Sequence, residues 1–340
     1  MQPTRRGLLK SLAVAPVLLS PTLLAACGAG SSSKAGTLNV GQISDSVAFF
    51  PLFIAEKQGF FTDEKLSLGE RPRLGTGAKV AAALKSGSID LGGGVMTDAL
   101  NLAEIDDQAR LTTSLISAYY VDIVVGGSAG KGGGSLEERV LALKGKKIGI
   151  TGPGSGTEAL VTYLFEQAGL DPAKDATLVN LGAVATAAVG ALKSGRVDAL
   201  SFFQPIGQQA EAAGVGSIYI SPAAGDVPSL DGDLHGVVFS RQSILDDKAD
   251  EVAAFQTAIG RALGVIRGDG SRVRDLLGQY LDGTPDAALD KLVPILQKET
   301  ATTPAVVESQ YEVARTFHVQ SGLVDAAPSY STLVPSRFRA

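Results

Sequence analysis

The sequence is poor in the residues on which metal sites and many catalytic centres depend. Its 340 residues include no tryptophan, one cysteine (Cys27) and two histidines, His235 and His318. A single cysteine excludes an internal disulfide and a cysteine metal site, and two histidines far apart in sequence offer little for metal binding or histidine-based catalysis. We therefore expect neither a metal nor a cofactor.

The chain also has fewer basic than acidic residues. The chain has 30 Lys and Arg against 35 Asp and Glu, which gives a formal charge of −5. The first 27 residues carry Arg5, Arg6 and Lys10 but no acid, so the remainder has 27 basic and 35 acidic residues and a charge of −8. No cluster of Lys and Arg offsets this balance, and nucleic acid is therefore not an expected partner.

The N-terminal segment has the pattern of an export and lipidation signal. Residues 4–10 read Thr-Arg-Arg-Gly-Leu-Leu-Lys, and uncharged, largely apolar residues follow at 11–26. A basic start, an apolar run and small residues before a processing point are typical of a secretory signal. The arginine pair resembles a twin-arginine signal. Leu24-Ala25-Ala26-Cys27 resembles the bacterial lipobox, which implies lipidation of Cys27 and cleavage before it.

The alternatives for this apolar run are a membrane-spanning helix and a buried core helix. The run is shorter than the ~20 residues that a spanning helix needs, and it contains Pro16 and Pro21. We therefore predict a lipoprotein signal at 1–27 and a flexible tether rich in Gly and Ser at 28–36. The remainder is expected on the outer face of the cytoplasmic membrane or in the periplasm, held by the lipid.

Beyond the tether, short apolar runs alternate with helical patterns, which favours an α/β fold with a largely parallel sheet. Strands are predicted at 38–43, 66–71, 89–94, 111–117, 121–125, 146–151, 178–181, 197–203, 218–220 and 236–239. Helices are predicted at 49–58, 79–85, 97–104 and 156–168, before 192 and from 206, and residues 244–317 are mostly helical with breaks at 283–285 and near 304.

An eight-residue pattern occurs twice in the chain. Residues 83–90 read ALKSGSID and residues 191–198 read ALKSGRVD. Each copy combines a helix end, a glycine stop and an aspartate that opens a strand. Corners of this kind often look alike, but one copy in each half favours two lobes of similar design, and the chain length suits two such lobes.

These corners and several other motifs resemble the bacterial solute-binding proteins of the nitrate, sulfonate, taurine and thiamine-precursor type, the NMT1/THI5-like family. The motifs are QISD at 42–45, FFPL at 49–52, AEKQGFF at 55–61, LKSGSID at 84–90, GKKIG at 145–149, GSGT at 154–157 and GRVDA at 195–199. The resemblance covers roughly residues 37–240, and it is carried by the order and spacing of the motifs together.

The resemblance implies a type II periplasmic-binding fold, in which two Rossmann-like lobes joined by a hinge close on a ligand. It places lobe one at 37–122 and 228–340 and lobe two at 123–227, with crossovers near 119–125 and 235–239. It further implies a monomer without catalytic activity that delivers its solute to an ABC permease. Two other functions stay open: an enzyme of the same fold that acts on a pyrimidine precursor, and a partner-binding sensor lipoprotein.

Ligands of open α/β sheets lie beyond the carboxyl ends of strands, where helix N-termini, hydroxyls and glycines can reach them. Aromatic residues at the same ends could stack on a flat ligand, but only one of two adjacent strand residues can face the cleft. The predicted ligand contacts are Ser44, Asp45, Phe49, Met96, Thr97, Tyr119, Gly154, Ser155, Gly156, Thr157, Phe203, Gln204 and His235.

Each of these contacts has a structural alternative. Thr97 and Thr157 would also serve as helix N-caps, the aromatic residues as core, and His235 as a loop residue. The Gly152–Thr157 loop matches neither a phosphate-binding loop nor a dinucleotide fingerprint. The cleft segments carry Asp45, Asp98 and Glu158 but no Arg or Lys, so a neutral, zwitterionic or amino-heteroaromatic ligand competes with a sulfonate or nitrate.

Overall fold

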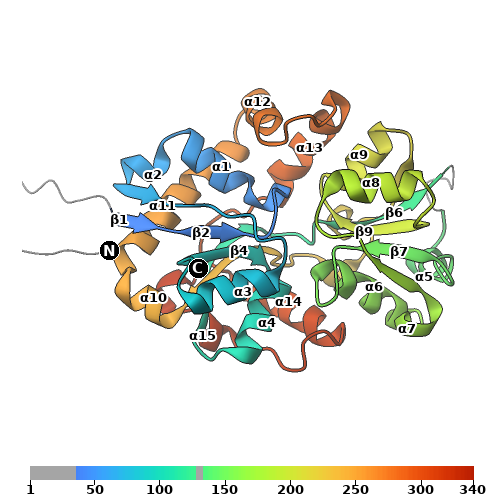
Figure 1. Cartoon of the computed structure of the whole chain (residues 1–340), viewed down its shortest axis with the longest axis horizontal. Helices are drawn as coiled ribbons and strands as arrows, with labels where there is room; N and C mark the ends of the chain where they lie inside the picture. The colour runs from blue at the N-terminus through green and yellow to red at the C-terminus, as the bar shows by residue number, and fades with distance from the viewer. Residues whose placement is uncertain (1–35, 128–132) are drawn as a thin grey trace, which may run out of the picture. The chain divides into compact units, whose positions relative to one another are not determined.

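The computed structural model describes residues 36–127 and 133–340 (Figure 1). The predicted lipoprotein signal, Cys27 and almost all of the predicted tether lie outside these residues. The described chain forms two groups of elements, each built on its own central sheet, which we call the first and the second lobe (Figure 1).

The first lobe contains a four-stranded sheet in the order β2-β4-β11-β5 and a two-stranded sheet, β1-β3. Its strands are β1 (Gly36–Leu38), β2 (Val40–Gln42), β3 (Leu66–Leu68), β4 (Leu91–Val95), β5 (Ala109–Ile116) and β11 (Gly236–Arg241). The helices between them are α1 (Phe50–Lys57), α2 (Phe60–Asp63), α3 (Gly77–Ser86) and α4 (Met96–Ile105).

The second lobe contains a five-stranded sheet in the order β10-β6-β9-β7-β8. Its strands are β6 (Val121–Gly126), β7 (Lys147–Ile150), β8 (Thr177–Asn180), β9 (Ala199–Phe203) and β10 (Gly216–Ile220). Its helices are α5 (Leu136–Leu141), α6 (Gly156–Gln167), α7 (Pro172–Asp175), α8 (Ala185–Lys193) and α9 (Ile206–Ala212). Separate apolar clusters fill its two faces, one under α6 and one under α8 and α9.

The C-terminal part is helical and returns to both lobes. It consists of α10 (Gln242–Asp247), α11 (Ala249–Ile266), α12 (Gly270–Tyr280), α13 (Asp286–Glu299), α14 (Glu308–Gln320) and α15 (Tyr330–Leu333). The buried side of α11 packs against α1 in the core of the first lobe, whereas α13 contacts α9 and α14 contacts α6 in the second lobe. Phe317 of α14 packs its ring 5.0 Å from the ring of Tyr163 on α6. The two lobes are thus also joined by side-chain packing.

Each central sheet is largely parallel, as predicted, but contains one strand that runs against the others. In the first lobe β2 and β4 are parallel, but β11 runs antiparallel to both of its neighbours, β4 and β5. In the second lobe β6 runs antiparallel to β9 and β10, while β7 is parallel to β8 and β9. β6 and β11 are the strands on which the chain enters a lobe from the other one. Such a strand enters its sheet at the end that faces the other lobe. The neighbouring strands finish at that end, so the entering strand is antiparallel to them.

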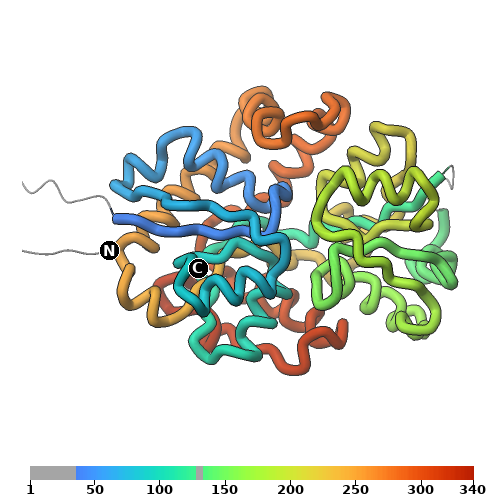
Figure 2. The backbone as a smooth tube through the Cα atoms, in the orientation of Figure 1, coloured from blue at the N-terminus to red at the C-terminus, as the bar shows by residue number. Residues whose placement is uncertain are grey.

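The chain crosses between the two lobes twice. β5 ends at Ile116 in the first sheet and β6 starts at Val121 in the second, and the return segment follows β10 and leads into β11 at Gly236. Figure 2 shows both crossings, the first in green-blue and the second in gold, in the middle of the described chain. In residues 36–127 and 133–340 no helix is both long and apolar enough to span a membrane.

Candidate ligand-binding site

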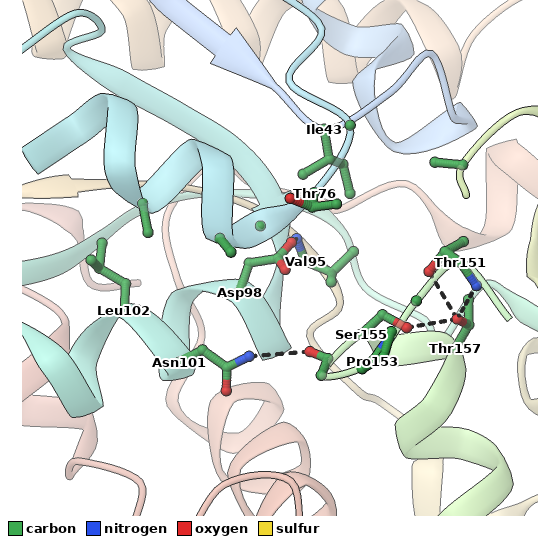
Figure 3. A pocket seen from close by; sticks show the side chains of 18 of the residues that line it. Ile43, Thr76, Val95, Asp98, Asn101, Leu102, Thr151, Pro153, Ser155 and Thr157 are labelled. Atoms are coloured by element: carbon green, nitrogen blue, oxygen red, sulfur yellow. Dashed lines mark hydrogen bonds between the residues drawn. The ribbon is translucent and has the colours of Figure 1, made fainter. Parts of the chain in front are cut away.

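A cavity of about 540 Å³ lies between the two lobes (Figure 3). The first lobe lines it with the N-terminal half of α3, with Val95 and with one side of α4. The second lobe contributes the loop from Thr151 to Thr157, Ala183 and Phe203, and the crossings contribute Tyr120, Val121 and His235. Its volume is in the range of pockets that hold small organic molecules.

Two helix N-termini meet in the first-lobe wall. Thr76 caps α3, because its Oγ1 accepts a hydrogen bond from the Lys79 amide at 3.3 Å. Asp98 caps α4, because its Oδ2 accepts from the Val95 amide at 2.9 Å. A Cβ atom at Gly94 would lie 2.7 Å from Oδ2 of Asp98, and one at Gly77 would overlap Oδ1. The carboxylate therefore fits at this point only because both positions are glycine.

Hydroxyls and a carboxylate hold the second-lobe wall in place. Ser155 caps α6 by accepting a hydrogen bond from the Glu158 amide at 3.3 Å, and Glu158 accepts from the Gly154 amide at 2.6 Å. Oγ1 of Thr157 accepts from the Thr151 amide at 2.9 Å and lies 2.7 Å from Oγ of Ser155. Figure 3 shows this network opposite Asp98 and Asn101. These bonds fix the conformation of the loop.

Hydrogen bonds also connect the two walls directly. Nδ2 of Asn101 on α4 donates to the carbonyl oxygen of Gly154 at 3.2 Å (Figure 3). The hydroxyl of Tyr119 donates to the carbonyl oxygen of Gly156. The Asn101 bond joins the two lobes, and the Tyr119 bond joins the first crossing to the second lobe.

His235 lies in the cavity wall next to both crossing tyrosines. Its ring is fully buried, with the ring of Tyr119 at 4.0 Å and that of Tyr120 at 4.9 Å. Within the described residues neither ring nitrogen has a hydrogen-bond partner, and Nδ1 is 3.7 Å from Oδ2 of Asp233. Burial, and then the neighbouring His318, hold the pKa of His235 well below its usual value, and burial raises that of Asp233 well above its own. The pair is therefore neutral and not a salt bridge.

A second buried histidine connects α14 to the site. Nδ1 of His318 donates to the carbonyl oxygen of Ala314 at 2.6 Å, so Nε2 is the acceptor for the hydroxyl of Thr97 at 2.7 Å. Burial lowers the pKa of His318 to about 4, which keeps it neutral. The C-terminal helix thereby fixes the start of α4.

Most of the wall is apolar, and its charges are unevenly placed. The apolar lining comes mainly from Ile43, Ala78, Ala81, Val95, Leu102, Ile105, Val121, Pro153, Ala183 and Phe203. The charged residues that line the cavity in the described part of the chain are Lys85, Asp98 and Glu104. Lys85 and Glu104 are exposed, whereas Asp98 is buried, and burial raises its pKa to about 6.

The cavity brings together part of the residue set that the sequence predicts. Six of the predicted contacts line it: Gly154, Ser155, Gly156, Thr157, Phe203 and His235. All but His235 belong to the second lobe, where a glycine-rich turn between a strand and a capped helix is an unambiguous signal. The capping alternative for Thr157 is wrong, because Ser155 caps α6 and Thr157 lies inside the helix.

The other predicted contacts do not line the cavity: Ser44, Asp45, Phe49, Met96, Thr97, Tyr119 and Gln204. Phe49 and Met96 are fully buried, and Phe49 packs against Gly93. Asp45 forms a salt bridge with Arg73. Gln204 is buried and donates to Glu299 at 3.2 Å.

The backbone direction explains two of these differences. Ser44 is buried while its neighbour Ile43 lines the cavity, and Tyr120 is in the wall where the prediction names Tyr119. In an extended segment, adjacent side chains point to opposite sides, and the sequence does not say which side is the cleft.

Several lining residues were missed in the prediction, above all on α3. The predicted helix began at Lys79, whereas α3 begins at Gly77 and is capped by Thr76. A Thr that directly precedes a helical pattern is a recognisable N-cap and would have brought Thr76 to Ala78 into the site. Asn101 and Leu102 gave no such signal, because their position depends on how α4 faces the second lobe.

The chain is similar to proteins of known fold along most of its length. A family model described as the NMT1-like family matches residues 32–272. A relative from Bacillus subtilis (strain 168), named "Putative binding protein YtlA", is 23% identical over 313 residues, with 87% of each chain covered.

Two solved structures show the same architecture. The alkanesulfonate-binding protein SsuA from Xanthomonas axonopodis pv. citri has 20% identity and a TM-score of 0.71, with 91% of this chain and all of that chain covered. The nitrate-binding protein NrtA from Synechocystis PCC 6803 has 17% identity and a TM-score of 0.63, with 76% and 70% covered. The predicted two-lobed periplasmic-binding fold is confirmed, and the chain belongs to the NMT1-like family.

Proposed function

We propose that this protein is the extracytoplasmic solute-binding component of an ABC importer. It captures a small organic solute in the cavity between its lobes, closes on it and delivers it to a membrane permease. The observation that carries the proposal is the cavity itself, which both lobes line and which Asn101 and Gly154 close from opposite sides. A ligand that contacts both lobes favours the closed state over the open one.

The similar proteins support the same function. SsuA is named for alkanesulfonate binding and NrtA for nitrate binding, and each shares the two-lobed fold. The candidate solutes are of two kinds: sulfonates, taurine and nitrate, and pyrimidine or thiamine-precursor compounds. The protein acts as a monomer without catalysis in this proposal.

The proposal includes a lipid anchor at Cys27. Once exported and acylated, the protein stays close to its permease, which raises its effective concentration there. In the same proposal, lobe one comprises residues 37–122 and 228–340, and lobe two comprises residues 123–227. Labelling of cells with radioactive palmitate tests the anchor: the wild-type protein takes up label, and Cys27→Ser does not. Equal labelling of both would contradict the anchor.

A thermal-shift screen tests the binding function. The panel contains alkanesulfonates, taurine, nitrate, aromatic carboxylates, pyrimidines, thiamine and amines. A ligand present at about one hundred times its dissociation constant adds ~2.7 kcal/mol to the free energy of unfolding, which is a clear shift. One or more stabilising compounds support the proposal. A flat response across the panel would contradict it and would favour a partner-binding role.

A further inference from the structure

The protein's own side chains already occupy one backbone amide at each of the three helix N-termini near the cavity. Backbone amides at a helix start bind anions because they lack partners inside the helix. Here the protein's own side chains occupy several of them: Thr76 takes the Lys79 amide, Asp98 takes the Val95 amide and Ser155 takes the Glu158 amide. Asp98 and Glu158 also place negative charge at the positive ends of α4 and α6, which further disfavours an anion.

The wall instead presents a buried acceptor. Three charged residues line the described cavity, and of these only Asp98 is buried, with 7% of its surface exposed. Its Oδ2 bonds to the Val95 amide, and no described residue donates a hydrogen bond to its Oδ1. Figure 3 shows the side chain on the first-lobe wall beneath Thr76 and Val95. Oδ1 is therefore an acceptor that is free to bind a donor group of a ligand.

Capping alone does not account for this arrangement. One oxygen is sufficient for the cap, and capping residues are usually solvated, whereas burial raises the pKa of this carboxyl group to about 6. The glycines at 77 and 94 leave room for the carboxylate in a wall that is otherwise largely apolar. His235 is a second polar group of this wall whose ring nitrogens have no partner among the described residues.

We infer that the solute is a small, largely apolar molecule with an amino or related N–H donor group, which binds Asp98, and that it is not an anion. This inference rests on the proposed function and specifies its substrate class. The amine donates to Oδ1 of Asp98, and the apolar body contacts residues such as Leu102 and Phe203. Specificity then comes from repulsion of anions as much as from attraction of the amine.

Three probes with the same body and different head groups test the inference: phenethylamine, 2-phenylethanol and 2-phenylethanesulfonate. Calorimetric titration of the wild-type protein should show binding of the amine at least roughly tenfold tighter than binding of the sulfonate. Asp98→Asn keeps an acceptor oxygen for the Val95 amide but removes the charge. It should weaken amine binding by roughly tenfold and leave the alcohol nearly unchanged. Asp247→Asn, at an exposed position outside the cavity lining, is the matched control and should change neither.

A second measurement needs no variant. The amine pairs with the ionised carboxylate, so its affinity for the wild-type protein should fall when the pH is lowered through about 6, whereas that of 2-phenylethanol should not. Tighter binding of the sulfonate, or equal amine binding by Asp98→Asn and wild type, would overturn the inference and leave the proposed function intact. Absence of binding by all three probes would also overturn it. The proposed solute-binding function would be contradicted only if the full thermal-shift panel also showed no stabilising compound.

Discussion

Asp98 and Gly77 lie in such close contact that position 77 has no space for a side chain. A Cβ atom built on Gly77 would overlap Oδ1 of the Asp98 carboxylate. Asp98 belongs to α4 and Gly77 to α3, so this contact sets the distance between the two helix N-termini that line the cavity. The contact also fixes the position of the Asp98 carboxylate in the cavity wall.

Gly77→Ala should destabilise the protein although alanine is the better helix former. The added methyl group forces the buried carboxylate to move, and overpacking of this kind lowers the free energy of unfolding by about 1–3 kcal/mol. Urea denaturation measures the change. Gly190→Ala in α8 is the control, because nothing lies within 4 Å of its added Cβ, and it should stabilise by about 0.5–1 kcal/mol. Stabilisation by both substitutions would contradict the contact.

Asn101→Ala should weaken ligand binding more than it changes stability. It removes the hydrogen bond to the Gly154 carbonyl that joins the lobes, and a bond of this kind contributes about 0.5–1.5 kcal/mol to the closed state. Calorimetry with a hit from the thermal-shift panel should show a severalfold loss of affinity. Gln297→Ala removes a similar bond, to Gly268, that does not cross between the lobes, and it should leave the affinity unchanged. Equal affinities for all three proteins would show that the Asn101 bond does not favour closure.

Thr97→Val should destabilise the protein through the loss of one buried hydrogen bond. The substitution leaves Nε2 of the fully buried His318 without a partner, which costs about 1–3 kcal/mol. Thr257→Val removes a comparable hydroxyl from an exposed site on α11, where it donates to Ala253, and should change the free energy of unfolding much less. Similar losses for the two variants in urea would contradict the role assigned to the Thr97–His318 bond.

The stability should fall as the pH rises from about 6.5 to about 8.5. Burial raises the pKa of Asp122 to about 7 and that of Glu299 to about 8. In this window the folded protein holds protons that the unfolded chain has already lost, so each deprotonation favours unfolding, by up to about 1.4 kcal/mol per pH unit for each group. The buried histidines, whose pKa values are lowered in the folded protein, oppose this trend only near the low end of the range, where the imidazoles of the unfolded chain are still partly protonated.

Urea denaturation at the two ends of this pH range measures the effect. Asp122→Asn replaces the protonated carboxyl group with a neutral amide of the same shape and should reduce the slope. Asp247→Asn, at an exposed position, should leave the slope as it is in the wild-type protein. A stability that is constant or increases over this range would show that the two carboxyl groups are not buried in the folded state.

The fold follows from the sequence to a large extent. Alternating apolar runs and helical patterns place the strands and the longer helices, because periodicity and capping are local properties, but they miss the short helices α2, α5, α7 and α15. The orientation of β6 and β11 does not follow from them. Both have the composition of ordinary buried strands, and their antiparallel direction results from the crossings between the lobes, which a local pattern does not encode.

The site is predictable only where its geometry is local. The Gly154–Thr157 turn was found because a strand, glycines and a capped helix follow one another directly. Tyr120 and Asn101 were not found, since their exposure to the cavity depends on strand phase and on how the lobes meet. Thr97 was predicted as a ligand contact, but its hydroxyl bonds to His318, a residue 221 positions away.

The measurement that tests the central claim most directly is calorimetric titration of a cavity-filled variant. Ala78 lies in the wall on the first turn of α3, and Ala78→Trp places an indole in the cavity without removing a polar group. Ala213→Trp, at an exposed position after α9, is the control. We predict that the wild-type protein and Ala213→Trp bind a thermal-shift hit with one site and equal affinity, and that Ala78→Trp binds it at least roughly tenfold more weakly. Undiminished binding by Ala78→Trp would show that the solute does not occupy the cavity between the lobes.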